Sequence, residues 1–161
     1  MKRLCALLCL LLALCACTAS TPQEPAPQFQ LYFISAGDYG PAITPQPYTG
    51  DLPPSPQALI HALLAGPEDD DLISPFPGGL TLRGCKPEDG CLQINFSEHY
   101  GGLADISLTL ADYCLVLTLC QLESVQSVEI LVAGSPIPHR SHQILIPQEA
   151  LLALEGSTPS S

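Results

Sequence analysis

The sequence contains few basic residues. Five Lys and Arg side chains stand against sixteen Asp and Glu, and the formal net charge is −11. Proteins that bind a phosphate backbone cluster Lys and Arg on one surface, whereas those of this chain are dispersed along it. The composition therefore excludes nucleic acid as a partner, and the same acidic charge would repel the body of the protein from an anionic lipid surface.

A hydrophobic run long enough to cross a membrane is also missing. The apolar run from Leu4 to Ala16 is 13 residues long, whereas a transmembrane helix needs about 20. The positively charged start Met1-Lys2-Arg3 precedes it, and a stretch rich in Thr, Ser, Pro and Gln follows. Together these features are typical of a secretory signal, so we predict that residues 1–16 are a signal peptide.

The end of this signal resembles a bacterial lipobox. A small residue, Ala16, directly precedes Cys17, and an aliphatic residue, Leu14, lies three places before it. We therefore predict that Cys17 becomes the first mature residue and carries a lipid, which anchors the protein to the extracytoplasmic face of the cell membrane. Ordinary cleavage with free secretion is the alternative. Residues 17–27, lipidated at Cys17 and rich in Pro, Ser and Thr, are expected to form a flexible tether.

Residues arranged as in a catalytic centre are lacking. His99, Tyr100 and Asp105, near Gly101-Gly102, form the polar cluster of most interest. The pattern contains no activated nucleophile, no oriented base and no pair of carboxylates in defined strands. We therefore expect no catalytic residues, and an enzyme that uses this cluster is the least favoured alternative.

Two polar runs resemble parts of metal sites. Residues 68–71 are four consecutive carboxylates, but they lack the alternating ligands and the turn glycine of an EF-hand loop. His139 and His142 lack a cysteine or carboxylate at the spacing of a zinc site. Both runs are interpreted as solvated loops, and no metal or cofactor is predicted.

The remaining pattern predicts one α+β domain over residues 28–147, with two helices packed on one face of a small, mostly antiparallel sheet that has a central β-hairpin. The hairpin, residues 80–97, consists of two alternating runs joined by an Asp-Gly turn. Further strands are expected at 28–35, 127–133 and 143–146, with a short edge strand at 43–49. The helices are expected from Ser55-Pro56 to Gly66 and from Asp105 to Leu122, and residues 148–161 are expected to form a tail that is disordered at its end.

Four cysteines lie beyond the signal. Strict alternation along the hairpin places Cys85 and Cys91 on its outer face, beside the same turn, and such a pair outside the cytoplasm favours a disulfide. Two independent thiols are the alternative. Cys114 and Cys120 are six residues apart, about 240° around a helix, so they cannot bond to each other there.

The order of landmarks resembles that of a known family. They are Ala62-Leu63-Leu64-Ala65-Gly66-Pro67, Leu72-Ile73-Ser74-Pro75-Phe76-Pro77, Glu88-Asp89-Gly90, Asn95-Phe96-Ser97, Gly101-Gly102 and Val125–Val132. This set is similar to the GerMN domain of sporulation and spore-germination lipoproteins.

The resemblance implies a domain outside the membrane that takes part in assembling the envelope machinery of spore formation or germination, without catalysis. We therefore predict a non-catalytic binding or scaffolding module. Its expected partners are the membrane, through the lipid at Cys17, and other envelope or sporulation proteins. A small-ligand-binding lipoprotein is the alternative.

Overall fold

The computed structural model describes residues 28–37, 40–138, 140 and 142–155. The predicted signal peptide, Cys17, the tether, His139 and residues 156–161 lie outside these ranges. Within the described residues, no helix combines the length and the apolar character needed to cross a bilayer.

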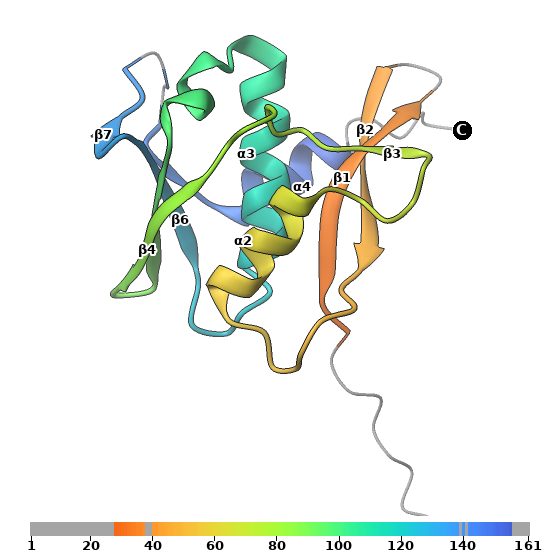
Figure 1. Cartoon of the computed structure of the whole chain (residues 1–161), viewed down its shortest axis with the longest axis horizontal. Helices are drawn as coiled ribbons and strands as arrows, with labels where there is room; N and C mark the ends of the chain where they lie inside the picture. The colour runs from red at the N-terminus through yellow and green to blue at the C-terminus, as the bar shows by residue number, and fades with distance from the viewer. Residues whose placement is uncertain (1–27, 38–39, 139, 141, 156–161) are drawn as a thin grey trace, which may run out of the picture.

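Two separate sheets form the framework (Figure 1). The first has the order β2-β1-β3 and is antiparallel; its strands are β1 (Gln30–Gly37), β2 (Gly40–Pro47) and β3 (Leu72–Ile73). The second has the order β4-β5-β6-β7, and β8 also pairs with β6. Its strands are β4 (Leu82–Glu88), β5 (Cys91–Phe96), β6 (Ser127–Val132), β7 (Ser135–Pro136) and β8 (Ile144–Leu145).

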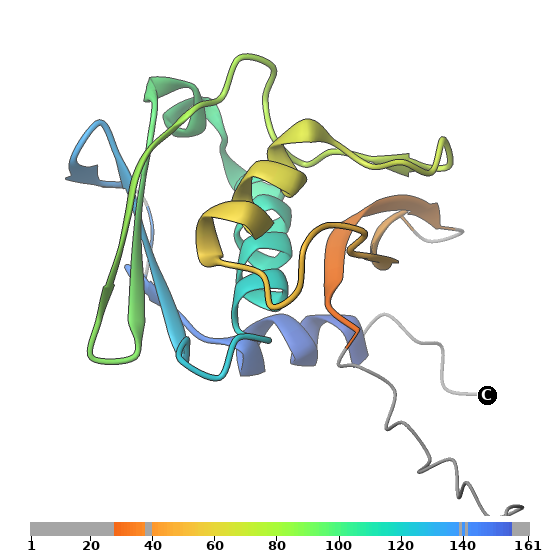
Figure 2. The same cartoon turned by 60° about the horizontal axis from the view of Figure 1, so that its bottom comes forward.

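The helices α2 (Pro56–Ala65) and α3 (Asp105–Leu119) lie between the two sheets, as both views show (Figures 1 and 2). A short 3₁₀ helix, η1 (Glu98–Gly102), precedes α3. Helix α4 (Pro147–Glu155) packs against α3. The α+β class is therefore confirmed. The predicted arrangement was wrong in detail, because the helices separate two sheets instead of covering one face of a single sheet.

Strands β5 and β6 pair in parallel, from Cys91 opposite Ser127 to Phe96 opposite Val132. Parallel neighbours need a crossover connection, and η1 with α3 supplies it here. Sequence alternation does not distinguish parallel from antiparallel neighbours, so this pairing was not predicted.

One hydrophobic core fills the space around α3. Its largest fully buried side chains come from both sheets, both central helices, η1 and the segment after β7: Phe33, Leu59, Ile60, Leu63, Leu92, Ile94, Phe96, Tyr100, Leu115, Leu119, Ile130 and Ile137. Because α3 is covered on both sides, every residue from Cys114 to Leu119 is buried. This explains why its apolar surface is wider than a single stripe.

Local signals set several element ends as predicted. The Ser55 hydroxyl accepts a hydrogen bond from the Ala58 N–H at 3.1 Å, Pro56 occupies the first turn, and Gly66 ends α2 with a φ of 92°. Asp89 and Gly90, with φ values of 48° and 82°, form the two-residue turn between β4 and β5.

Other boundaries differ from the prediction. Asp105 is the first residue of α3, not its cap; the N-cap is Ala104, whose N–H donates to the Ser107 hydroxyl at 3.3 Å. Helix α4 occupies most of the predicted C-terminal tail. Strand β2 is a full edge strand, and its three prolines are tolerated because an edge strand has one side without ladder hydrogen bonds.

Candidate functional site

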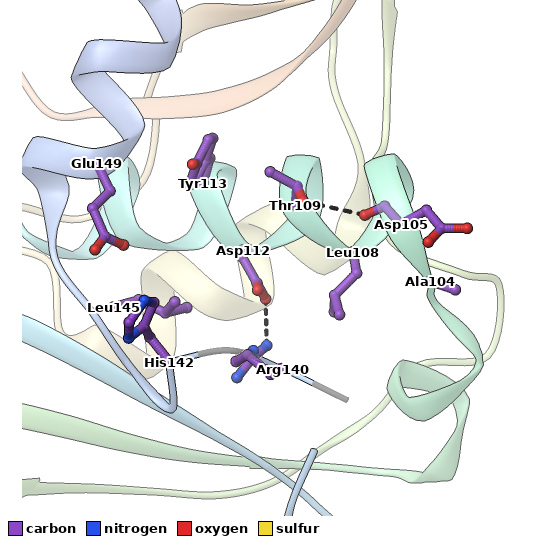
Figure 3. A pocket seen from close by; sticks show the side chains of 10 residues that line it. All are labelled: Ala104, Asp105, Leu108, Thr109, Asp112, Tyr113, Arg140, His142, Leu145 and Glu149. Carbon is purple, nitrogen blue, oxygen red and sulfur yellow. Dashed lines mark hydrogen bonds and ion pairs between the residues drawn. The ribbon is translucent and has the colours of Figure 1, made fainter. Parts of the chain in front are cut away.

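A cavity of about 610 Å³ opens beside α3, and charged and polar side chains form much of its lining (Figure 3). One wall is a single face of α3, since its residues recur at intervals of three and four: Asp105, Leu108, Thr109, Asp112 and Tyr113. The other wall comes from the chain after β7: Arg140, His142, Leu145 of β8 and Glu149 of α4. The two walls are far apart in the sequence and meet only in the folded domain.

A buried ion pair closes the floor of this cavity. Arg140 Nη2 donates to Asp112 Oδ1 at 2.5 Å, and the two side chains are only 5% and 7% exposed. Tyr100 donates its hydroxyl to the same oxygen at 2.7 Å. The three groups thus connect η1, α3 and the segment before β8 through one carboxylate oxygen.

Burial controls the acid–base chemistry of this cluster. Loss of hydration raises the pKa of Asp112 to about 6, although Arg140 and the Tyr100 hydroxyl act in the opposite direction. Burial also raises the pKa of Tyr100 well above its ordinary value, and the neighbouring Asp112 charge adds to this rise. Tyr100 therefore stays protonated and serves as a hydrogen-bond donor.

Arg140 keeps one donor without a partner. Its Nη1 reaches the Ile130 carbonyl oxygen only at 3.5 Å, and its buried Nε–H donates to no described residue. A buried donor without an acceptor is costly, so it marks a place where an oxygen atom is needed.

The structure does not assemble the three residues of the predicted polar cluster into one centre. The Tyr100 hydroxyl is buried against Asp112. The exposed His99 ring lies 3.3 Å from the Ser97 hydroxyl, and Asp105 lies at one end of the cavity (Figure 3). His99 and Tyr100 therefore have different hydrogen-bond partners, and of the three residues only Asp105 lines the cavity.

The predicted facing of Cys85 is wrong, and Cys85 and Cys91 are both free thiols. A β-bulge shifts the register between Leu82 and Gly84, so that Cys85 lies opposite the buried Ile94 and packs against the core. Cys91 lies opposite Glu88 and alternates with the buried Leu92. Because the bulge reverses the facing of β4, the two thiols lie on opposite faces, an arrangement that does not favour the predicted disulfide.

The acidic run forms an exposed loop. Residues 68–71 are exposed and make local hydrogen bonds, for example from the Asp71 N–H to Asp69 Oδ1 at 2.9 Å. His142 lines the cavity alone, since His139 lies outside the described residues. In the described part of the chain, no three His, Cys, Asp or Glu side chains are arranged to hold a metal ion.

Sequence reasoning missed Asp112 and Arg140. Two signals were present: Asp112 is a carboxylate inside an otherwise apolar helical run, and Arg140 is one of three basic residues after the signal. A buried charge is kept only with a partner, so an isolated carboxylate in an apolar helix predicts a basic residue elsewhere in the chain. The sequence alone does not say which one.

The fold defines the class of protein, an α+β domain with a helical layer between two small sheets, and comparison with known proteins places it in a family. The family model described as "Germane: Sporulation and spore germination" matches residues 30–138. The chain therefore belongs to this sporulation and spore-germination family, whose domain is also called GerMN.

Solved structures share the fold. The first GerMN domain of the sporulation protein GerM from Bacillus subtilis is similar at a TM-score of 0.61 and 17% identity, over 75% of this chain and 98% of that one. The tandem GerMN domains of the same protein give a TM-score of 0.55 and 21% identity, over 67% of this chain. The match covers 39% of that tandem structure. No curated protein matches by sequence.

Proposed function

We propose that this protein is an extracytoplasmic lipoprotein whose GerMN domain acts as a non-catalytic binding or scaffolding module in sporulation or spore germination. The family match over residues 30–138 is the observation that carries the proposal. The separation of His99, Tyr100 and Asp105 supports a non-catalytic role, because no described set of these side chains shares a reacting position.

The lipid anchor is part of the same proposal. The lipobox pattern Leu14-Cys15-Ala16-Cys17 supports it. The acidic charge of the chain makes direct adsorption of the domain to an anionic bilayer unfavourable, so the lipid would provide the membrane contact. Residues 18–27 would then separate the domain from the bilayer.

Metabolic labelling with a fatty acid tests the anchor. The wild-type chain and a Cys15→Ser control should both take up label and sediment with membranes, whereas Cys17→Ser should do neither. Label that persists in Cys17→Ser would overturn the assignment of the lipidated residue.

Chemical crosslinking in intact cells of the native host, followed by membrane isolation and affinity capture, tests the binding role. The wild-type chain should capture a defined set of envelope proteins, and Cys17→Ser should lose them because it leaves the membrane. Capture of the same proteins by an unrelated lipoprotein with the same anchor would show that the anchor alone explains the association.

A further inference from the structure

We propose that three prolines of β2 close the free edge of the first sheet to a second copy of this chain, which would otherwise pair its own β2 with that edge. Strand β2 is the outer strand of the sheet, and within the described residues no strand pairs with its far side. Such an edge offers unpaired N–H and C=O groups to another chain. The inference goes beyond the proposed function and does not depend on it.

The register of β1 and β2 determines which backbone groups of β2 face outward. Successive residues of an antiparallel pair alternate between hydrogen-bonded and non-bonded positions. Next to the last pair of the ladder, the Tyr48 N–H donates to the Phe29 carbonyl oxygen at 2.8 Å. Counted by twos from Tyr48, the residues that bond to β1 are Gln46, Thr44, Ala42 and Gly40. The alternate residues, whose backbone groups point away from β1, are Pro41, Ile43, Pro45 and Pro47.

Proline therefore occupies three of the four outward positions and none of the bonded ones. Because proline has no N–H, the edge keeps its outward carbonyl oxygens but has a single outward donor, that of Ile43. Two copies paired through β2 would bury carbonyl groups without donors, which is costly, and the proline rings would occupy the space of the missing hydrogen atoms. The prolines thus leave the ladder with β1 intact and disable its outer side.

Other forms of edge protection are missing from β2. Its eight residues contain no charged side chain, and its register with β1 runs without a bulge. Charges and bulges are the common alternatives to proline at a sheet edge. Ala42, Ile43 and Thr44 in the middle of the strand are half-buried. Without the prolines β2 would be a long, uncharged edge strand, which is a template for strand addition.

The long edge strand of the second sheet, β4, combines a proline with these other devices. Glu88 and Cys91 flank the two-residue turn and form a bonded pair, so the next residue of β4, Pro87, is at an outward position. The strand also has the bulge near Gly84 and a charged side chain at Lys86. Since β2 has neither a bulge nor a charge, its protection depends on proline alone.

Analytical ultracentrifugation of the mature chain tests the proposal, with Cys17→Ser to keep it in solution and a reductant to prevent intermolecular disulfides. The variant Pro41→Thr/Pro45→Thr/Pro47→Thr supplies three outward N–H groups and leaves the bonds to β1 unchanged. It should form dimers or larger species at concentrations about tenfold below those at which the wild type is still monomeric. Pro138→Thr, at an exposed position outside both sheets, is the control and should behave as the wild type.

Hydrogen exchange at the Ile43 amide locates the contact between copies. In the wild type this amide should exchange as a solvent-exposed amide at every concentration. In the associated triple variant it should exchange at least about tenfold more slowly, because it then bonds to the second copy. Circular dichroism checks that each variant is folded, and Pro45→Thr alone, in the middle of the edge, replaces the triple variant if that variant does not fold.

Four outcomes would overturn the proposal. The first is a folded edge variant that stays monomeric wherever the wild type does. The second is association that leaves the exchange of the Ile43 amide unchanged. The third is association of Pro138→Thr as strong as that of the edge variant. The fourth is protection of Ile43 in the wild type that increases with concentration, since β2 would then pair between copies despite its prolines.

Discussion

The side chain of Gln121 takes the place of a neighbouring strand for Gln30. Its Oε1 accepts the Gln30 N–H at 2.9 Å, and its Nε2 donates to the Gln30 carbonyl oxygen at 2.7 Å. Thr118, fully buried in α3, accepts the next free strand N–H, that of Tyr32, at 3.1 Å. Since β3 pairs only with Ile34 and Ser35, these two side chains satisfy the part of the β1 edge that β3 does not reach.

Replacing Gln121 should therefore destabilise the domain through the β1 edge. Gln121→Ala leaves the N–H and carbonyl of Gln30 without partners in a partly buried position, so we expect a loss of about 1–3 kcal/mol in the free energy of unfolding. Urea denaturation measures it. Gln57→Ala, at an exposed position of α2, is the matched control and should change stability by less than about 0.5 kcal/mol. Equal effects of the two variants would contradict the role of Gln121.

Removing the Tyr100 hydroxyl tests the buried cluster. Tyr100→Phe keeps the ring stacked on Phe96, whose centroid is 5.1 Å away, but deletes the donor to Asp112. We expect a loss of about 1–3 kcal/mol at neutral pH, because a buried carboxylate oxygen loses a hydrogen bond. Tyr48→Phe is the control, since Tyr48 is half-buried and its hydroxyl bonds to no described residue. A Tyr100→Phe chain as stable as the control would show that the hydrogen bond is not stabilising.

The raised pKa of Asp112 predicts a specific dependence of stability on pH. Its folded pKa, about 6, lies above the reference value of 3.8, so between these values the folded state binds the extra proton. The stabilising contribution of this group to the free energy of unfolding is complete below about pH 4. It falls as the pH rises to about 6 and is constant above that pH. The size of the fall is on the order of 3 kcal/mol.

Asp112→Asn isolates this contribution because asparagine does not titrate. The difference in unfolding free energy, wild type minus variant, should decrease from pH 4 to pH 6.5, as measured by urea titrations at each pH. Asp70→Asn, at an exposed position, is the control. Its difference in unfolding free energy from the wild type should not change with pH. A difference that rises with pH would show that Arg140 holds the pKa of Asp112 below its ordinary value.

Thiol labelling tests the cysteines directly. All four cysteines of the described chain are free, so alkylation in denaturant without a reductant should modify Cys85, Cys91, Cys114 and Cys120. In the folded protein, burial raises the pKa of Cys114 to about 12, and we expect it to react last. Mass spectrometry counts the modified sites, with a reduced sample as control. Protection of Cys85 and Cys91 that disappears on reduction would establish the disulfide that the structure lacks.

The parts of the fold that the sequence predicted are those with local causes. The Ser55 cap and the Asp89-Gly90 turn depend on neighbouring residues, and both lie where they were expected. The bulge near Gly84 depends on how β4 fits its partner strand, which alternation does not show. One inserted residue was enough to reverse the facing of Cys85 and to remove the basis of the predicted disulfide.

The candidate site has mostly long-range causes. Asp112 and Arg140 are 28 residues apart in the sequence and meet because β6 and the segment after it return beside α3. Helix α4 had a local signal, Pro147 at its first position, but an isolated short helix is marginal and its packing on α3 could not be foreseen. The sequence therefore supplied the family and the central helices and strands, and the structure supplied α4 and the cavity.

The parallel pairing of β5 with β6 also bears on how the protein acquires its cavity. The chain must close a loop from residue 97 to residue 126 before these strands can meet, and such non-local closure is entropically costly and slows folding. The two walls of the cavity come from within this loop and from beyond β6, so the segment that bears the second wall follows directly from the strand that closes the loop. Substitutions that weaken the β5–β6 pair would therefore act on the cavity from a distance, without touching any residue that lines it.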